Sequence, residues 1–454
     1  MSQSKKDLIS VLGAAIGKKY VLTDQESLKF YSMDVYRSIE IPIAILQPGS
    51  VEELQEVVRV ATGLDVAIVA RGGGASYTDG YLPTTSESVI IDTTRLNKIV
   101  EINEEDMYVI VEPGVTWSEM YEALSAKNLR TPFWGPFSGL KATVGGSSSQ
   151  NSLSMGTSTY GGSPESILCY DIVLANGELL KTGSSAMKNS QPFFRHYGPD
   201  LTGLFSGDAG ALGVKARITL RLIRHPSHTL TCSFGFKDYT SMSQGMAAAA
   251  REQSVSSNWG LDPQLQQGQL GSTTAKDAIQ AAFAVLKTAR NPFEAIIQLG
   301  KMALAGKRFL TGFDYSAHFV VEGYSTAEVK SKLAQTRKVL GPHGTEIANT
   351  IPTVLGAMPF MELYPILGPQ GERWVPMHGI VSFSKMQALH DSLMALYEEN
   401  KEKMDALSLV PGAMFMSYST HGFLYEPVLY WHDDRSLYHS KYLPQEYLDM
   451  LPTY

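Results

Sequence analysis

Short apolar runs separated by polar turns organise the first part of the chain. Four such runs predict strands, because each is short, apolar and bounded by turn residues: residues 44–47, 66–70, 89–92 and 107–111. A serine or threonine stands three residues before a glutamate after two of them, which is the spacing of a capping box. These pairs predict helices over 51–62, from Ser50 and Glu53, and over 117–124, from Thr116 and Glu119. Strand, turn and helix alternate, as in a small α/β layer.

The rest of the chain alternates strands with amphipathic helices. The pattern predicts strands at 171–175, 218–222, 230–236 and 318–322, and helices from 247 onward, over 275–288 and over 326–339. The composition changes after Pro226, and 454 residues exceed what one core usually holds. We therefore expect an α+β protein of two domains, residues 1–224 and 225–454.

Features of the N-terminus and of the composition limit the class of protein. Residues 8–16 predict a helix rather than a signal peptide, because no cleavage site follows them, and no apolar stretch approaches the roughly 18 residues of a membrane span. A net charge of −7 argues against nucleic-acid binding. Cys169 and Cys232 lie in no paired or metal-binding motif, so a cytoplasmic protein without disulfides is expected. The basic region 275–308 fits a membrane or redox-partner contact or a solvated helix face.

A glycine turn follows the strand at 66–70. Its residues are Arg71, Gly72, Gly73, Gly74, Ala75, Ser76 and Tyr77. Consecutive glycines let the backbone present successive N–H groups to an anion, for which a pyrophosphate is the natural guest. A tight surface turn is the alternative.

Two further stretches are rich in small residues. Residues 131–162 contain Gly145, Gly146, Ser147 and Asn151, and predict either an ordered binding loop or a flexible linker. Trp134, Phe137 and Tyr160 within this stretch favour the ordered loop. The second cluster, residues 206–213, precedes the strand at 218–222, and its small residues would let the backbone approach a flat ligand.

Taken in order, these motifs resemble the FAD-binding domain of the vanillyl-alcohol oxidase and p-cresol methylhydroxylase flavoprotein superfamily. The resemblance covers about residues 8–224, and residues 21–24 with 31–34 look most like the glycolate oxidase and D-lactate dehydrogenase branch. It implies a two-subdomain FAD-binding domain followed by an α+β cap domain that binds substrate. The residues that it implies for FAD are Arg71, Gly72, Gly73, Gly74, Ala75, Ser76, Pro113, Gly114, Val115, Gly145, Gly146, Ser147, Asn151, Gly207, Asp208, Gly210, Gly213 and Val214.

The chain departs from the family pattern at three places. Ala75 stands where covalently flavinylated relatives carry a histidine, so non-covalent FAD is expected unless a cap histidine is attached. Ser149, Gln150 or Asn151 replaces the acidic residue that aromatic-alcohol oxidases place near the flavin. The C-terminal residues lack the basic, Pro-Gly-containing segment of relatives, so its contribution is expected to be absent or replaced.

Oxidation of a C–OH group requires a proton acceptor near the hydroxyl oxygen, since the flavin accepts only the hydride. Tyr77 is the first candidate, because aromatic-alcohol oxidases bind the phenolic oxygen with a tyrosine at the matching position. His378 could act as base, substrate ligand or flavin-linking residue, and Arg373 could pair with a substrate carboxylate. His421 and Tyr425 are candidate cavity-lining groups. Each of these residues has a structural role as its alternative.

The resemblance implies an FAD-dependent oxidoreductase that oxidises a small hydroxylated substrate. No catalytic metal is expected, because the His-x-x-Gly-Asp-Gly-Asn-x-His run of metal-dependent hydroxy-acid dehydrogenases is missing and neighbouring residues such as His432 and Asp433 point apart in a strand. This favours a phenolic or aromatic alcohol over a D-2-hydroxy acid. A flavin-binding subunit that needs a partner chain, or a homo-oligomer, stays open, as does the electron acceptor. A nicotinamide enzyme is disfavoured because the spaced glycines of that fingerprint are missing.

Overall fold

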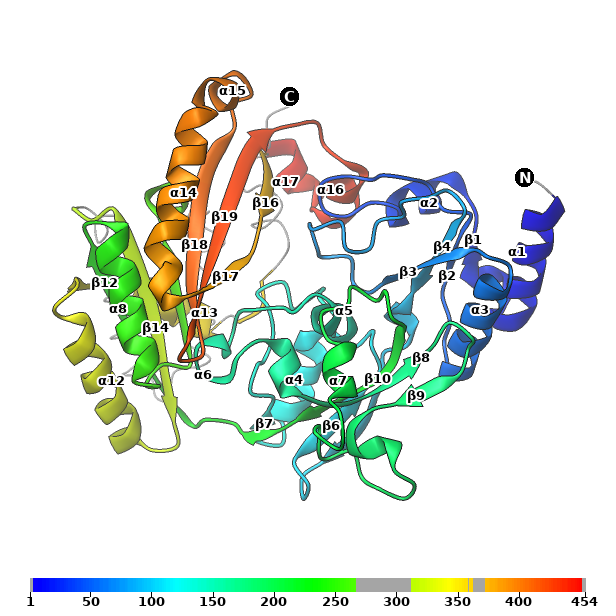
Figure 1. Cartoon of the computed structure of the whole chain (residues 1–454), viewed down its shortest axis with the longest axis horizontal. Helices are drawn as coiled ribbons and strands as arrows, with labels where there is room; N and C mark the ends of the chain where they lie inside the picture. The colour runs from blue at the N-terminus through cyan, green and yellow to red at the C-terminus, as the bar shows by residue number, and fades with distance from the viewer. Residues whose placement is uncertain (1–2, 267–311, 358, 362–371, 451–454) are drawn as a thin grey trace. The chain divides into compact units, whose positions relative to one another are not determined.

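The computed structural model describes residues 3–266, 312–357, 359–361 and 372–450 (Figure 1). Contacts within the chain divide it into two units. The first comprises the described residues up to Leu153, Gly162–His225 and Arg435–Asp449. The second comprises Ser154–Gly161 and the described part of Pro226–Asp434. The sequence predicted a single domain boundary near residue 225. The structure in addition assigns residues 154–161 to the second unit and residues 435–449 to the first.

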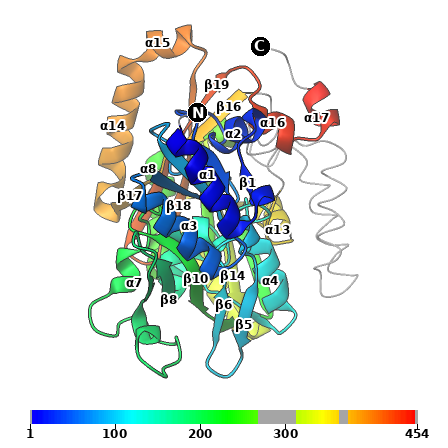
Figure 2. The same cartoon turned by 90° about the vertical axis from the view of Figure 1, so that its right-hand side faces the viewer.

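A four-stranded sheet of order β1-β2-β4-β3 opens the first unit. Strands β2 and β3 run parallel to β4, and Arg71 at the end of β3 pairs with Asp92. Helices α1 and α3 lie side by side (Figures 1 and 2), and their apolar residues Leu12 and Leu54 are fully buried in the core. The bounds are α1 (Gln3–Ile16), β1 (Val21–Leu22), α2 (Gln25–Tyr31), β2 (Ala44–Leu46), α3 (Val51–Gly63), β3 (Ala67–Arg71) and β4 (Ser88–Asp92).

A second, antiparallel sheet of order β5-β6-β10-β8-β9 follows in the same unit. The predicted helix from Trp117 is present, and Thr116 and Glu119 form the expected reciprocal capping box. The bounds are β5 (Ile99–Asn103), β6 (Tyr108–Val111), α4 (Trp117–Ser125), β7 (Leu129–Arg130), α5 (Val144–Ser149), β8 (Ile167–Val173), β9 (Leu179–Lys181), α7 (Leu201–Leu204), β10 (Val214–Arg221) and β11 (Ile223–Arg224). Residues 144–149 form a helix, so this part of the glycine- and serine-rich stretch is ordered.

The C-terminal segment belongs to the first unit. Helix α16 (Leu437–Tyr442), drawn in red, lies beside α2, drawn in blue, in both views (Figures 1 and 2). Helix α17 (Gln445–Met450) follows it. The hydroxyl of Ser436 accepts a hydrogen bond from the His439 N–H at 3.4 Å and so caps α16.

One large sheet of order β15-β12-β14-β13-β18-β19-β16 forms the second unit, and β17 pairs with β19. Helices α8, α12 and α14 cover one face of it (Figure 1), over a core that contains Phe319 and Phe415. The bounds are α6 (Thr157–Tyr160), β12 (His228–Phe236), α8 (Tyr239–Arg251), β13 (Ser257–Leu261), β14 (Tyr315–Gly323), α12 (Thr326–Leu340), β15 (Thr345–Ile347), α13 (Thr350–Ala357), β16 (Glu372–Pro376), β17 (Gly379–Ser382), α14 (Met386–Glu399), α15 (Lys401–Ala406), β18 (Val410–Tyr418) and β19 (Gly422–His432).

Both units mix helices with sheets, so the predicted α+β class is confirmed. Helix α8 begins at Tyr239, earlier than the expected start at 247, because the Asp238 carboxylate accepts the Ser241 N–H at 2.7 Å and caps the helix there. The predicted helix at 275–288 and the basic region 275–308 lie outside the described residues. Among the helices that the structure describes, none combines the length and apolarity needed to cross a membrane.

Candidate functional site

The glycine turn requires glycine for steric reasons. A Cβ on Gly72 would overlap the Thr143 hydroxyl, and a Cβ on Gly73 would overlap the carbonyl oxygen of Lys141. Gly74 has a φ of +68°, in the left-handed region that favours glycine. The turn is therefore pressed against the segment that leads into α5.

The main-chain N–H groups of residues 72–76, the central part of this turn, have no partner among the described residues. Main-chain N–H groups in folded proteins nearly always have a partner, so a run of free ones indicates solvent or a ligand. Successive free N–H groups at a glycine turn suit the oxygens of a phosphate.

Four small-residue segments lie together in the first unit: the glycine turn, residues 113–115, residues 145–151 and the cluster at 206–213. Gly145 donates its N–H to the Pro113 carbonyl at 3.0 Å, which joins the segment at 113–115 to α5. Gly207 donates its N–H to the Ser148 carbonyl at 2.9 Å, which joins the cluster at 206–213 to the other end of α5. Since the glycine turn also packs on Thr143, helix α5 is the element that brings the four segments together.

Several predicted cofactor residues also have structural partners. Ser147 accepts a hydrogen bond from the indole N–H of Trp117 at 2.7 Å. Asp208 pairs with Lys215 at 2.7 Å, and both side chains are buried. Gly114 donates its N–H to the Leu96 carbonyl at 2.7 Å, and Val214 begins β10 opposite Val173. These residues shape the segments whether or not they touch a cofactor.

Two further members of the set lie around the cluster at 206–213. A Cβ on Gly207 would overlap the Asn151 side chain, and a Cβ on Gly213 would lie 2.5 Å from the Ile172 side chain. Gly210, with a φ of +78°, donates its N–H to the Asp208 carboxylate at 3.0 Å. The second carboxylate oxygen of Asp208 is buried without a hydrogen-bond partner among the described residues. A long dinucleotide such as FAD fits these features: the unused N–H groups of residues 72–76, glycines at which a Cβ would clash, and the unpaired Asp208 oxygen.

In the second unit, His378 is joined to a glutamate. His378 follows β16, and its Nε2 lies 2.5 Å from the Glu426 carboxylate on β19. The His378 side chain is 35% exposed, whereas that of Glu426 is 4% exposed. Burial lowers the pKa of His378, but the charge and hydrogen bond of Glu426 outweigh it, so this pKa is raised above the ordinary value of 6.5. The exposed residues Met377 and Ile380 flank the pair.

The other catalytic candidates of the second unit do not join this pair. Tyr425 is buried under α14, where its hydroxyl bonds to His390 Nδ1 at 2.9 Å. It faces away from Glu426, because neighbouring residues of a strand point to opposite faces. Arg373 is buried, bonds to the Asp434 carbonyl and lies 3.8 Å from the Asp433 carboxylate. His421 is exposed in the turn between β18 and β19, with its ring 5.9 Å from that of Tyr418.

Tyr77 is the remaining catalytic candidate, and a metal site is the remaining feature that the sequence analysis considered. Tyr77 follows the glycine turn in the first unit and is half-buried. Across the described residues, no three His, Cys, Asp or Glu side chains are grouped as metal ligands would be.

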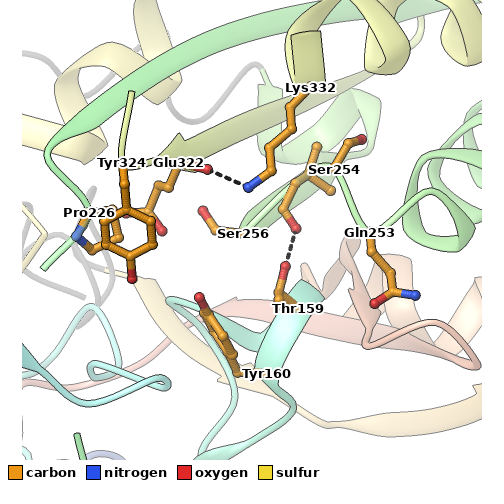
Figure 3. Close-up of a pocket in the computed structure, with 11 residues that line it drawn as sticks. Thr159, Tyr160, Pro226, Gln253, Ser254, Ser256, Glu322, Tyr324 and Lys332 are labelled. Atoms are coloured by element: carbon orange, nitrogen blue, oxygen red, sulfur yellow. Dashed lines mark hydrogen bonds between the residues drawn. The ribbon is translucent and has the colours of Figure 1, made fainter. Parts of the chain in front are cut away.

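Two polar features of the second unit are too buried or too small to hold a substrate. His318 is fully buried between the hydroxyls of Ser233, at 2.9 Å, and Ser316, at 3.2 Å, and burial lowers its pKa to about 3. A cavity of about 60 Å³ lies beside Lys332, whose ammonium donates to the Glu322 carbonyl at 2.9 Å (Figure 3). This volume holds a few water molecules, whereas ligand pockets usually measure several hundred Å³.

Sequence reasoning missed two residues at these sites. Glu426 was hidden in an apolar strand, although a single carboxylate in such a strand is itself a signal. Tyr438 of α16 donates its hydroxyl hydrogen to the Gly74 carbonyl of the glycine turn. The sequence predicted that the C-terminal contribution is absent or replaced, and in the structure residues 435–449 belong to the first unit, where Tyr438 contacts the glycine turn. The signal was the pair Tyr438 and Tyr442, four residues apart and so on one helix face.

Comparisons with known proteins find similarity in both sequence and fold. Residues 42–183 match the family of FAD binding domains. The mitochondrial D-lactate dehydrogenase (cytochrome) of Arabidopsis thaliana is 32% identical over 51% of this chain and 40% of its own length. The flavoprotein subunit of 4-cresol dehydrogenase (hydroxylating) from Pseudomonas putida is 31% identical over 42% of this chain and 38% of its own length. The alignments thus span about two fifths of these curated relatives.

The fold extends further than the sequence similarity. The structure of 4-ethylphenol oxidase from Gulosibacter chungangensis matches with a TM-score of 0.73 and 18% identity, over 99% of this chain and 86% of that one. Residues 42–183 thus form an FAD binding domain, so the cofactor is FAD, and the chain has the fold of 4-ethylphenol oxidase and p-cresol methylhydroxylase.

Proposed function

We propose that the protein is an FAD-dependent oxidoreductase that oxidises the C–OH group, or a benzylic C–H bond, of a small phenolic or aromatic alcohol. The free N–H groups of residues 72–76, inside the matched FAD binding domain, are the observation that carries the cofactor site. The glycine turn would hold the diphosphate, and the segments at 113–115, 145–151 and 207–214 would lie along the rest of the cofactor. Bound FAD supplies an acceptor for the hydride that leaves the substrate carbon.

His378 is the proposed base. Glu426 accepts the hydrogen on Nε2, so Nδ1 is left to take the proton of the substrate hydroxyl. The O–H bond then breaks toward Nδ1, and the Glu426 carboxylate stabilises the imidazolium that forms. Tyr77 is the proposed hydrogen-bond partner of a phenolic oxygen.

Arg373 bears on the substrate class. A 2-hydroxy acid needs a cation for its carboxylate, and Arg373 was the candidate for this role. Its guanidinium already bonds to the Asp434 carbonyl and faces Asp433, which weighs against a free carboxylate site there. This supports the phenolic substrate over the hydroxy acid.

A D-2-hydroxy acid is the second candidate, because D-lactate dehydrogenase is among the relatives at 32% identity. A flavin-binding subunit that acts with a partner chain is the third, since the similar 4-cresol protein is itself described as a flavoprotein subunit. A homo-oligomer and a cytoplasmic location stay predictions, and no electron acceptor is predicted.

Anaerobic stopped-flow mixing of the FAD-loaded protein with a substrate panel tests the proposal. We expect phenols such as 4-ethylphenol and vanillyl alcohol to bleach the flavin absorbance at least tenfold faster than D-lactate, glycolate or D-2-hydroxyglutarate. Bleaching by the hydroxy acids alone would replace the phenolic proposal with the second candidate. Turnover of the purified chain with a dye as electron acceptor would exclude the third candidate, because it would show that no partner chain is needed.

A further inference from the structure

A buried cation lies against the glycine turn. Arg71 is 3% exposed, and its guanidinium lies 5.5, 4.9 and 5.3 Å from the ring centres of Phe30, Tyr31 and Tyr81. A Cβ on Gly74 would overlap its Nη2 atom, so the guanidinium lies directly beside the turn. The turn thus combines free N–H groups with a full positive charge.

This charge has no close counter-ion in the described structure. The Nε and Nη2 atoms of Arg71 are buried and have no hydrogen-bond partner there. Asp34 and Asp92 influence the charge from a distance, but other groups hold their carboxylates. Asp34 accepts the main-chain N–H groups of Tyr36 and Arg37, and Asp92 accepts bonds from Thr94 and Gln47. A buried guanidinium without a counter-ion destabilises the folded protein, so its presence here points to an anion that a bound ligand supplies.

Helix α16 closes the aromatic cage around Arg71. The Tyr438 ring stacks on Phe30 at 6.2 Å, and the Tyr442 ring lies 4.6 Å from that of Tyr438. Lys441 anchors the helix to α2 through an ion pair with Glu26 at 3.1 Å. The C-terminal helix is therefore part of the wall that keeps water away from the guanidinium.

The hydrogen bond from Tyr438 also fixes one peptide group of the turn. The Gly74 carbonyl accepts the Tyr438 hydroxyl hydrogen. Because a peptide group is planar and trans, its C=O and the N–H of the next residue point in opposite directions. The bond at Gly74 therefore sets the direction of the Ala75 N–H, which is one of the unused donors.

We propose that the Arg71 side chain is a fixed positive charge for the cofactor diphosphate, and that Tyr438 is a positioning residue that aims the Ala75 N–H at the same anion. This rests on the proposed assignment of the glycine turn to FAD. The diphosphate charge is thus met by a buried cation as well as by amide groups. In a site of low dielectric constant, such a charge acts far more strongly than a solvated one.

Titration of FAD-depleted full-length protein with FAD, followed by flavin fluorescence, tests the charge. We expect Arg71→Met to weaken FAD binding at least tenfold, and Arg71→Lys to recover most of that loss because it keeps the charge. Without FAD, Arg71→Met should melt at the wild-type temperature or above, since it removes a buried unpaired charge. If the role of Arg71 were purely structural, Arg71→Met would lower the melting temperature and the FAD affinity together. Arg95→Met is the matched control, because Arg95 packs on Tyr20 instead.

Tyr438→Phe tests the positioning step, since it keeps the ring and removes only the hydroxyl. We expect FAD binding to weaken about three- to tenfold, the usual effect of one hydrogen bond. Tyr442→Phe, which removes a hydroxyl that does not bond to the turn, should leave the affinity unchanged. Equal FAD affinities for Arg71→Met and Arg71→Lys would overturn the role of the charge, and a wild-type affinity for Tyr438→Phe would overturn that of the helix. Failure of the wild-type protein to bind FAD would instead refute the assigned cofactor site.

Discussion

At the scale of single residues, the coupling of His378 to Glu426 has a consequence for pH. The pKa of His378 is raised above 6.5, so the neutral form needed for a base is lost as the pH falls through that raised value. Flavin reduction by substrate should therefore rise with pH along a limb that lies above pH 6.5. The limb reports the environment that Glu426 creates.

Glu426→Gln should move this limb to lower pH by about one unit, because burial then acts on His378 without a compensating charge. The maximal rate should fall about tenfold, since the imidazolium loses its partner. The measurement is the rate of flavin reduction from pH 5 to 9. Glu398→Gln, at an exposed position of α14, is the control. A limb that stays in place in Glu426→Gln would exclude His378 as the base.

Asp262 connects one carboxyl group to the stability of the second unit. Its carboxylate accepts the Leu265 N–H at 2.8 Å, and burial raises its pKa from the ordinary value of 3.8 to about 6. The folded state therefore binds this proton more tightly than the unfolded state. The contribution of Asp262 to stability is therefore highest below about pH 4 and is lost as the pH rises toward about 6.

Asp262→Asn keeps the hydrogen-bond acceptor and removes the ionisation. We expect it to raise the free energy of unfolding by roughly 1–2 kcal/mol at pH 8 and to change it little at pH 4. Urea unfolding at the two pH values measures the difference. The exposed Asp314→Asn serves as control, and an equal effect at both pH values would contradict the assigned cause.

At the scale of elements, the sequence pattern was sufficient where local chemistry decides the structure. Strands β2, β3 and β4 and helix α3 were predictable because short apolar runs, turn residues and the Ser50 cap all lie within a few residues of one another. The start of α8 was not, since polar and small residues between Asp238 and residue 247 hide its apolar face. A cap without a following apolar pattern is a weak signal.

The candidate site shows the same difference between features that the local sequence reveals and features that it does not. The glycine segments were predictable because positive φ and close backbone approach require glycine itself. The pairing of Tyr438 with Gly74 joins positions 364 residues apart, and nothing in either local sequence encodes it. Likewise, the partner of His378 follows from the pairing of β17 with β19, which sets the register of that edge. Local motifs thus predicted the glycine segments, whereas the contacts made by Tyr438 and His378 come from long-range packing.

At the scale of the whole molecule, the return of residues 435–449 makes the first unit discontinuous in sequence. Any ligand that binds the folded first unit stabilises all its parts together, by about 2.7 kcal/mol when its concentration is 100 times Kd. The C-terminal segment should share this gain, because Tyr438 bonds to the turn that would hold the diphosphate. We therefore expect stability at the C-terminus to depend on FAD binding at the glycine turn.

Hydrogen exchange followed by mass spectrometry can measure this dependence. On addition of FAD, amides of residues 435–449 should exchange up to about a hundredfold more slowly, together with those around the glycine turn. Amides of β12 and β14 in the second unit provide the internal control and should change much less. In Tyr438→Phe, the protection should decrease at the C-terminus while it persists at β3. If exchange at residues 435–449 ignored FAD, α16 would be a neighbour of the cofactor site without being part of it.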